Sequence, residues 1–272
     1  MTPSATALVD LLAAEDSGFQ APTVEEFYPK PLFSFDVVGI HFDVTRITLI
    51  LVIATAAILL LLVAAVRKPS IVPTKLQYLG ESGYSLVRDG MARDVIGPKG
   101  LPFAPFLASL FFFILANNAM SIIPLAQISP MSKFAYPLVL AVIVWLLYNW
   151  VGIREQGAGK YFKDAAVPPG VPVGALILVT PIELLQVFVI RPFTLAVRLF
   201  ANMFAGHMLL VVFSLGSVYL LTVGNFSVIF APFSFLMAIV MTFFEILVIV
   251  LQAYVFTVLT ATYLAGSVEP AH

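Results

Sequence analysis

Two apolar runs, residues 180–222 and 227–264, constrain this chain more than any other feature. After Arg198 no lysine or arginine occurs up to His272. As single α-helices the runs would measure roughly 65 Å and 57 Å at ~1.5 Å per residue. A bilayer core is only ~30 Å thick. Each run therefore either breaks into two spans or forms one strongly inclined helix.

The inclined arrangement is the preferred interpretation, because no polar loop interrupts either run. Pro192 and Pro232 are positioned to kink the helices without letting the chain leave the membrane. The stretch TVGNFS at 222–227 supplies turn residues in Gly224–Asn225. The sequence thus predicts a long helical hairpin, kinked and strongly tilted.

The first arm of this hairpin is predicted to begin at TPIELL, residues 180–185. Thr180 is a suitable N-cap, and Pro181 suits the first helical position. Glu183 then occupies the third position, where a carboxylate completes a capping box.

Composition assigns the chain to the polytopic membrane proteins, since 61% of residues are hydrophobic and 11% are charged. A soluble domain is about 25% charged. The net charge of −1 suggests no nucleic-acid partner. The absence of cysteine excludes thiolate chemistry, and three scattered histidines make a metal site unlikely. No phosphate-binding loop occurs, so we expect no bound nucleotide and no cofactor.

The first half of the chain predicts three conventional spans, at 47–66, 101–124 and 134–153. Arg67, Lys68 and Lys75 follow the first span, so the positive-inside rule puts the N-terminus outside and the C-terminus in the cytoplasm. Residues 74–95 predict an amphipathic helix on the cytoplasmic face, or else a short soluble loop. Residues 154–164 form a basic cytoplasmic loop. The acidic residues 1–45 lack a signal-peptide pattern and are expected outside the membrane. The expected divisions are 1–45, 46–164 and 165–272.

Ionisable residues lie within the hairpin, where each costs ~2.5–3.5 kcal/mol at membrane depth. In an antiparallel pair that turns at 224–225, Arg198 faces Gln252 and His207 faces Glu245. Asn202 is one turn from Arg198 and shares its face. His207 is half a turn off that face, so we expect it to face a different cavity.

Each residue also has a structural interpretation. Glu183 can act only as a capping carboxylate, Asn202 can hold helices together, and His207 with Glu245 can form a buried structural pair. Arg191 can extend to the interface. Arg198 is the hardest to explain structurally, because no acidic residue lies within four positions on its helix.

The segments RLFANMFAGH (198–207) and FFEILVIVLQAYVFTVLTATYL (243–264) resemble subunit a of the rotary F-type ATP synthase. The resemblance covers most of the chain. It implies that Arg198 is the family's essential arginine and that Asn202 and Gln252 are its polar neighbours. It places the family's proton-relay positions on His207 and Glu245, exchanged relative to some bacterial members. An acidic residue that some members carry before Ile-Ile-Pro is Ser121 here.

The resemblance implies a proton-conducting stator subunit in the bacterial cell membrane, with two half-channels that load and unload carboxylates on a rotating ring. Its partners would be a ring of small c subunits, peripheral-stalk b subunits and the lipid bilayer. Glu183 would belong to the cytoplasmic side of the path. The chain itself would have no catalytic site and bind no nucleotide.

Two other functions stay open on the residues alone. A secondary transporter with a midplane ion site predicts repeats in both halves, and none is visible. A proton-pumping subunit of a respiratory complex would favour buried lysines, yet the sequence has no lysine from 164 onward. A hydrolytic membrane enzyme is the least favoured, for want of a nucleophile–base pair.

Overall fold

The computed structural model describes residues 31–37, 40–67, 70–124, 126–167, 173–223 and 226–268. Five helical stretches in these residues are long and apolar enough to cross a bilayer. The chain is therefore an all-α polytopic membrane protein, as the sequence predicted, with one small sheet. Three of these stretches contain α2 (Arg46–Val66), α4 (Ala104–Ala119) and α5 (Ala135–Gln156), and the other two contain the hairpin arms α8 (Arg191–Thr222) and α9 (Ala231–Val268).

The first span follows a β-hairpin that the sequence did not predict. Strands β1 (Phe33–Val37) and β2 (Ile40–Val44) pair antiparallel, with Phe33 opposite Val44. Helix α2 then begins at Arg46, where the hydroxyl of Thr45 accepts the backbone N–H of Thr48 at 3.4 Å. A side-chain oxygen at this position satisfies one of the unpaired N–H groups of the first turn. Residues 1–30 of the expected extramembrane segment lie outside the described residues.

The connections between spans contain more helix than expected. Residues predicted as an amphipathic helix form α3 (Lys75–Val87) and a continuing π-helix, η2 (Arg88–Ile96). A 3₁₀-helix, η3 (Pro98–Phe103), leads into α4, which ends at Ala119 rather than near Pro124. A second, η4 (Pro130–Ser132), precedes α5. Residues 154–164, predicted as a basic loop, are mostly helical instead: α5 continues to Gln156, and α6 (Ala158–Ala166) follows with positive φ at Gly157.

The predicted start of the hairpin at Thr180 is also wrong. Helix α7 spans Val173–Leu185, so Pro181 lies inside it. The apolar residues before Thr180 continue the helical run, and proline removes only one backbone bond from it. The 3₁₀-helix η6 (Phe226–Phe230) leads into α9, which begins four residues later than the predicted run and ends at Val268 rather than Leu264. The turn at Gly224–Asn225 lies outside the described residues.

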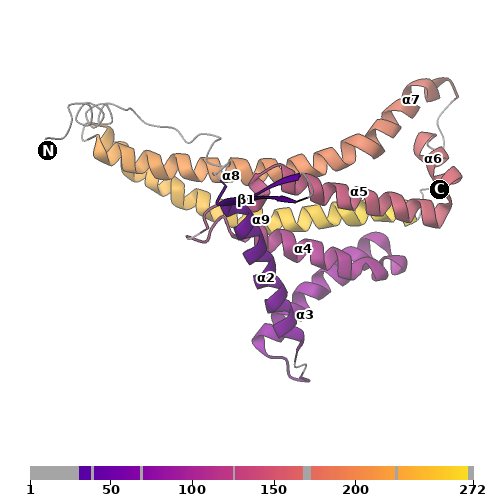
Figure 1. The fold of residues 1–272 in the computed structure, drawn as a ribbon, viewed down its shortest axis with the longest axis horizontal. Coiled ribbons are helices and arrows are strands. Elements are labelled where there is room, and N and C mark those ends of the chain that lie inside the picture. The colour runs from indigo at the N-terminus through magenta and orange to yellow at the C-terminus, as the bar shows by residue number, and fades with distance from the viewer. Residues whose placement is uncertain are drawn as a thin grey trace.

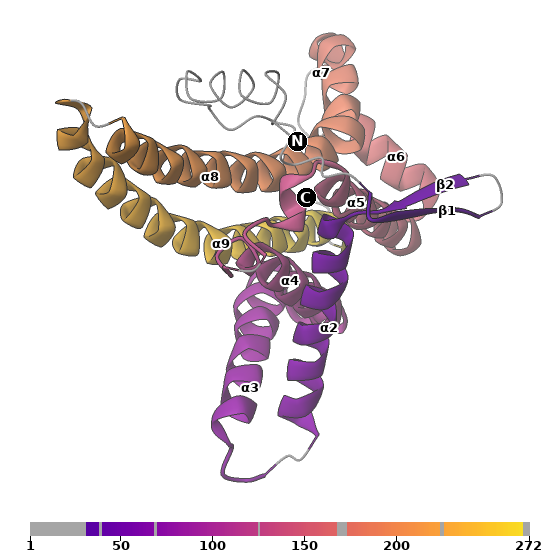
Figure 2. The ribbon, with the colours of Figure 1, turned by 60° about the vertical axis from the view of Figure 1, so that its left-hand side comes forward.

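Neither arm of the hairpin breaks into two spans. The π-helix η5 (Gln186–Ile190) joins α7 to α8 immediately before Pro192. A residue without an N–H leaves a carbonyl one turn earlier unpaired, and a widened turn accommodates that loss. In Figures 1 and 2, α8 and α9 lie side by side and run across α2 rather than along it.

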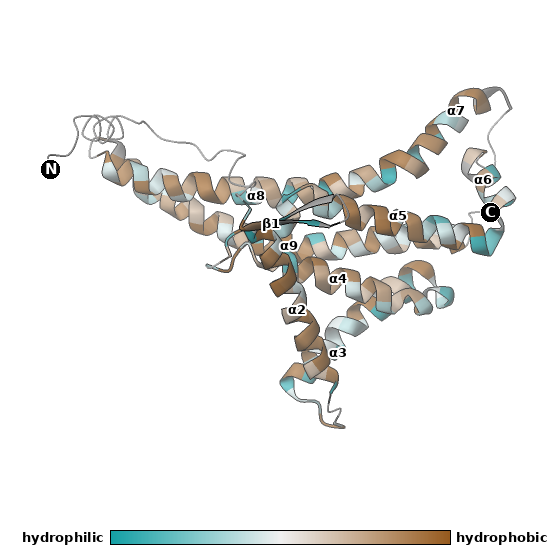
Figure 3. Ribbon diagram, in the orientation of Figure 1, coloured by the Kyte–Doolittle hydropathy of each residue, from teal (hydrophilic) through white to brown (hydrophobic). Residues whose placement is uncertain are grey.

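The core lies where α4, α5, α8 and α9 meet, and α9 contacts the other three helices. Its fully enclosed side chains include Leu107, Ile114, Leu199 and Phe256. Many large apolar side chains outside this centre are exposed, and Figure 3 shows that α2 in particular consists mostly of hydrophobic residues. Phe243 is 70% exposed on α9. A water-facing helix would not present such residues, so lipid or another protein covers them.

Candidate functional site

Contacts between α8 and α9 fix the register of the hairpin. The Ser234 hydroxyl donates to the carbonyl oxygen of Phe213 at 2.9 Å. Farther along, the amide nitrogen of Asn202 donates to Oε1 of Gln252 at 2.7 Å. Both contacts fit an antiparallel pair that turns near 224–225, but the second is displaced by one helical turn from the predicted pairing of Gln252 with Arg198.

Gln252 is buried in the seam between the two arms, whereas Asn202 is exposed on α8. Gln252 is only 2% exposed, and its hydrogen bond goes to Asn202 rather than to Arg198. Its Nε2 atom has no hydrogen-bond partner among the described residues. A buried N–H without an acceptor costs about 1–3 kcal/mol, so this amide is positioned to bind water or an incoming group.

Arg198 lies one turn before Asn202 and is exposed at the surface of α8. No described side chain forms a hydrogen bond or ion pair with its guanidinium. Other exposed residues at helical spacing continue its face, and they are small: Thr194, Ala201 and Ala205. Small side chains let another helix approach closely within a membrane. Arg198 therefore presents a fixed charge on a surface shaped for a neighbouring helix.

His207 and Glu245 are enclosed instead of exposed, at 8% and 2%. This confirms that His207 and Arg198 occupy different faces of α8. Glu245 packs against Gly206, since its Cγ atom lies 4.0 Å from the place a Cβ would occupy there. The carboxyl therefore lies beside the helical turn that carries His207.

The carboxyl of Glu245 also meets the segment that follows α4. The hydroxyl of Ser121 faces it, but donates to the carbonyl oxygen of Asn118 at 2.9 Å. Consequently neither Oε1 nor Oε2 of Glu245 has a hydrogen-bond partner among the described residues. A buried carboxyl in this situation requires a proton or water.

Helix α4 carries two further buried polar residues close to its end. Asn117 and Asn118 are fully buried on α4. Asn118 accepts a hydrogen bond from the Ser129 hydroxyl at 3.1 Å, while its Nδ2 and the Oδ1 of Asn117 have no described partner. Asn118, Ser121 and Glu245 form a buried polar cluster with unsatisfied atoms. The signal in the sequence was two adjacent amides in an otherwise apolar span.

Glu183 and Arg191 lie on the other side of Arg198 along the first arm. Glu183 is half-buried on α7, within the helix rather than at its cap. The guanidinium of Arg191 stacks over the ring of Tyr263, 5.5 Å from its centroid. It is also close to Tyr161 on α6. Burial raises the pKa of Tyr161 above its ordinary value of 10.0, although the positive charge of Arg191 acts in the opposite direction.

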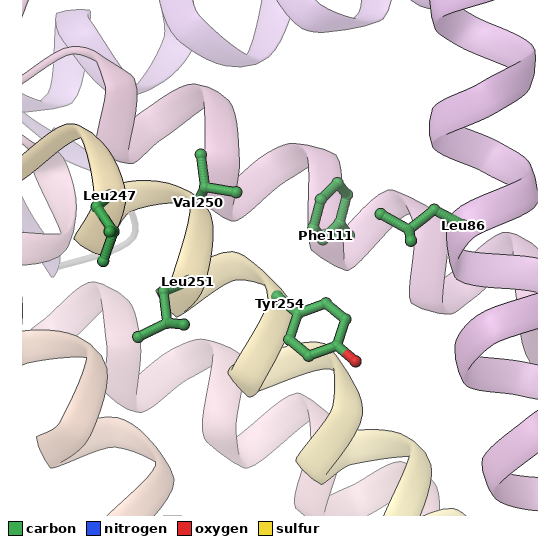
Figure 4. Close-up of a pocket in the computed structure, with 6 residues that line it drawn as sticks. All are labelled: Leu86, Phe111, Leu247, Val250, Leu251 and Tyr254. Carbon is green, nitrogen blue, oxygen red and sulfur yellow. The ribbon is translucent and has the colours of Figure 1, made fainter.

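A hollow of about 330 Å³ beside α9 lacks this polar character. Figure 4 shows its walls, formed by side chains of α3, α4 and α9, with the Tyr254 hydroxyl the one oxygen among the labelled side chains. Leu247 and Leu251 lie on the face of α9 opposite Glu245 and Gln252. The hollow is therefore separate from the polar cluster.

Comparison with known proteins identifies the family. The sequence model described as ATP synthase A chain matches residues 47–265. The chain belongs to the ATP synthase A chain family.

Proteins named ATP synthase subunit a are similar along nearly the whole chain. The Parafrankia sp. (strain EAN1pec) protein is 46% identical over 95% of this chain and 88% of its own. The Frankia alni protein is 43% identical over 93% and 87%. The Rhodococcus erythropolis protein is 41% identical over 95% and 93%.

Proposed function

We propose that this chain is the proton-conducting stator subunit of a bacterial ATP synthase complex. It would lie against a ring of small rotor subunits and be held by peripheral-stalk subunits. Membership of the ATP synthase A chain family supports a role in proton translocation. The observation that carries the finer proposal is the position of Arg198, exposed on α8 while His207 and Glu245 are buried on a different face.

The exposed face of α8 is the proposed contact with the rotor. A rotor helix can approach closely beside Ala201 and Ala205, because neither side chain projects far. Arg198 would then meet each deprotonated rotor carboxylate as the ring turns. A guanidinium suits this role because it stays charged at any physiological pH and binds carboxylates through two parallel hydrogen bonds.

The buried polar cluster is the proposed outer half-channel. Glu245, Ser121 and Asn118 have polar atoms that water can bind, and His207 is positioned on the adjoining turn of α8. Imidazole titrates near neutral pH and can pass a proton to a nearby carboxylate. Protons entering here would reach the rotor beside the Asn202–Gln252 pair.

The inner half-channel is proposed to leave past Glu183, on the side where α7 joins α8. The basic residues after α2 and α5 support a cytoplasmic location for that side, with the N-terminus outside. Arg198 lies between the two routes, and its charge opposes direct proton passage between them. Each proton crossing ~150 mV releases roughly 3.5 kcal/mol, which a leak would dissipate as heat.

The test is proton-driven ATP synthesis in vesicles containing the assembled complex. Arg198→Ala is expected to abolish synthesis, and Arg198→Lys is expected not to restore it, because an ammonium lacks the planar fork. Arg154→Ala is the matched control, since Arg154 is an exposed arginine stacked on Trp150, 5.4 Å away. Normal synthesis by an assembled Arg198→Ala complex would overturn the proposal.

A further inference from the structure

A second polar site surrounds Arg191, away from the buried cluster. A cavity of about 380 Å³ lies between the start of α8 and the last turns of α9. The widened turn of η5 precedes Arg191, so the side chains at this junction are spaced differently from those of a regular helix. The lining residues are Gln186, Ile190, Arg191, Thr194, Thr262, Tyr263 and Gly266.

The guanidinium of Arg191 is held in place by aromatic rings and not by acids. It stacks over Tyr263, and Tyr148 and Tyr161 are also close to its charge. Both of those hydroxyls donate elsewhere, to the carbonyl oxygen of Val187 at 2.6 Å and to Oδ1 of Asn149 at 2.9 Å. Stacking orients the guanidinium while leaving its N–H groups without an acceptor among the described residues.

Gln186 adds a second uncommitted donor to the cavity, because its amide has no hydrogen-bond partner among the described residues. The hydroxyls of Thr194 and Thr262 donate to their own helices instead, to Ile190 at 2.7 Å and Val258 at 2.9 Å. The cavity thus offers one cation and one amide to an anion. A group with several acceptor oxygens, such as a phosphate, matches this set.

The surroundings favour a phosphate attached to an acyl chain. Ile182, Leu185 and Val189 are exposed on α7 and η5, at 51%, 51% and 53%, and give alkyl chains a surface to cover. The cavity lies at the end of α9 where Gln156 donates to the carbonyl oxygen of Ser267 at 2.7 Å. Basic residues of α5 and α6 lie at this same end, which the positive-inside rule assigns to the cytoplasm.

We propose that this cavity binds the phosphate of an anionic phospholipid from the cytoplasmic leaflet. Anionic lipids are enriched in that leaflet, and basic pockets between membrane helices bind their headgroups. Arg191 would supply the paired donors, Gln186 a further one, and the exposed side chains of α7 the contact for the acyl chain. The lipid would lie at the junction of α7 and α8, beside the proposed inner half-channel past Glu183, and its binding can be measured without proton flow.

Native mass spectrometry of the assembled, delipidated complex tests this proposal. Phosphatidylglycerol and phosphatidylcholine with the same acyl chains are titrated separately. Wild type is expected to bind phosphatidylglycerol at least tenfold more tightly, and Arg191→Gln is expected to lose that preference. Arg154→Gln is the matched control and should bind as wild type does. Equal binding of the two lipids by wild type, or undiminished binding by Arg191→Gln, would overturn the proposal.

Two further measurements distinguish a lipid site from a site for free phosphate, and a loss of binding from a failure to assemble. Millimolar inorganic phosphate added to the titration is expected to leave phosphatidylglycerol bound; displacement would show a site for free phosphate and contradict a lipid site. If Arg191→Gln does not assemble, Arg191→Lys and Gln186→Leu replace it, each with an expected loss of about threefold. Wild-type affinity in both of these variants would contradict the proposed donors.

Discussion

Gly206 gives the sharpest way to test the path past Glu245. A Cβ at this position would lie 4.0 Å from Cγ of Glu245. Two carbons touch at ~3.5–4.0 Å, so alanine just makes contact and any larger side chain must displace the glutamate. Gly206→Ala should fold, with helix stability improved by up to about 1 kcal/mol. Gly206→Leu should overpack the seam, at a cost of about 1–3 kcal/mol.

Proton flow should therefore fall with the size of the side chain at this position. The assay is passive proton conductance, driven by a potassium diffusion potential, in vesicles stripped of the nucleotide-binding head. Gly206→Ala should conduct within about twofold of wild type. Gly206→Leu should conduct at least tenfold less, which corresponds to a barrier raised by ~1.4 kcal/mol.

Gly216 provides the matched control on the same helix. A Cβ there would lie 3.3 Å from the Ser234 hydroxyl, in the same seam but distant from the polar cluster. Gly216→Leu thus imposes similar crowding and should leave conductance near wild type. Conductance through an assembled Gly206→Leu complex equal to wild type would refute the assignment of this space to the proton path.

Three other predictions follow from the same contacts. Cysteines replacing Asn202 and Gln252 should cross-link readily in a chain without native cysteine, as gel mobility would show; no cross-link would mean the register is wrong. Exchanging His207→Glu with Glu245→His should recover part of the conductance lost in either single change; a double variant no better than the worse single one would leave only a structural pair. Tyr161→Phe should cost about 1–3 kcal/mol by leaving Oδ1 of Asn149 unpaired. Because burial raises the Tyr161 pKa, wild-type stability from this group should be lost above about pH 10, and thermal unfolding of the variant should lack that loss.

The sequence predicted the first apolar helix well, because a continuous apolar run bounded by charged residues marks both of its ends. Helix α2 begins one residue before the predicted span and ends where predicted. The α8–α9 register was also predictable, since antiparallel helices joined by a short turn pair residues equidistant from it. That rule paired Gln252 with Arg198, and the observed hydrogen bond joins Gln252 to Asn202, one helical turn away.

Helix-capping patterns predicted the helix boundaries less well than the extent of the apolar runs did. Thr180 and Pro181 have the pattern of a helix start, yet they lie inside α7 because apolar residues before them continue the helix. The sequence predicts a loop around Gly157, whereas in the structure this residue only redirects the chain from α5 into α6. There the ring of Tyr161 occupies the place a Cβ would take at Gly152, and no local rule predicts such a contact.

The buried cluster escaped prediction for a different reason. Asn118 and Ser121 come from a different part of the chain from Glu245, and only tertiary packing brings them together. Spacing rules apply within one helix or one hairpin. The exposed fraction of the Arg198 side chain could not be predicted from the sequence either, because it depends on which neighbouring helices cover α8.

Arg198 is proposed to separate two proton routes that the rotor alone connects. The most direct measurement is proton leak through the membrane sector after the rotor ring has been chemically locked to the stator. Wild type with a locked ring should pass no protons above the lipid background. Arg198→Ala with the same lock should leak, because the charge between the routes is gone. A locked Arg198→Ala complex that stays as tight as wild type would contradict this account.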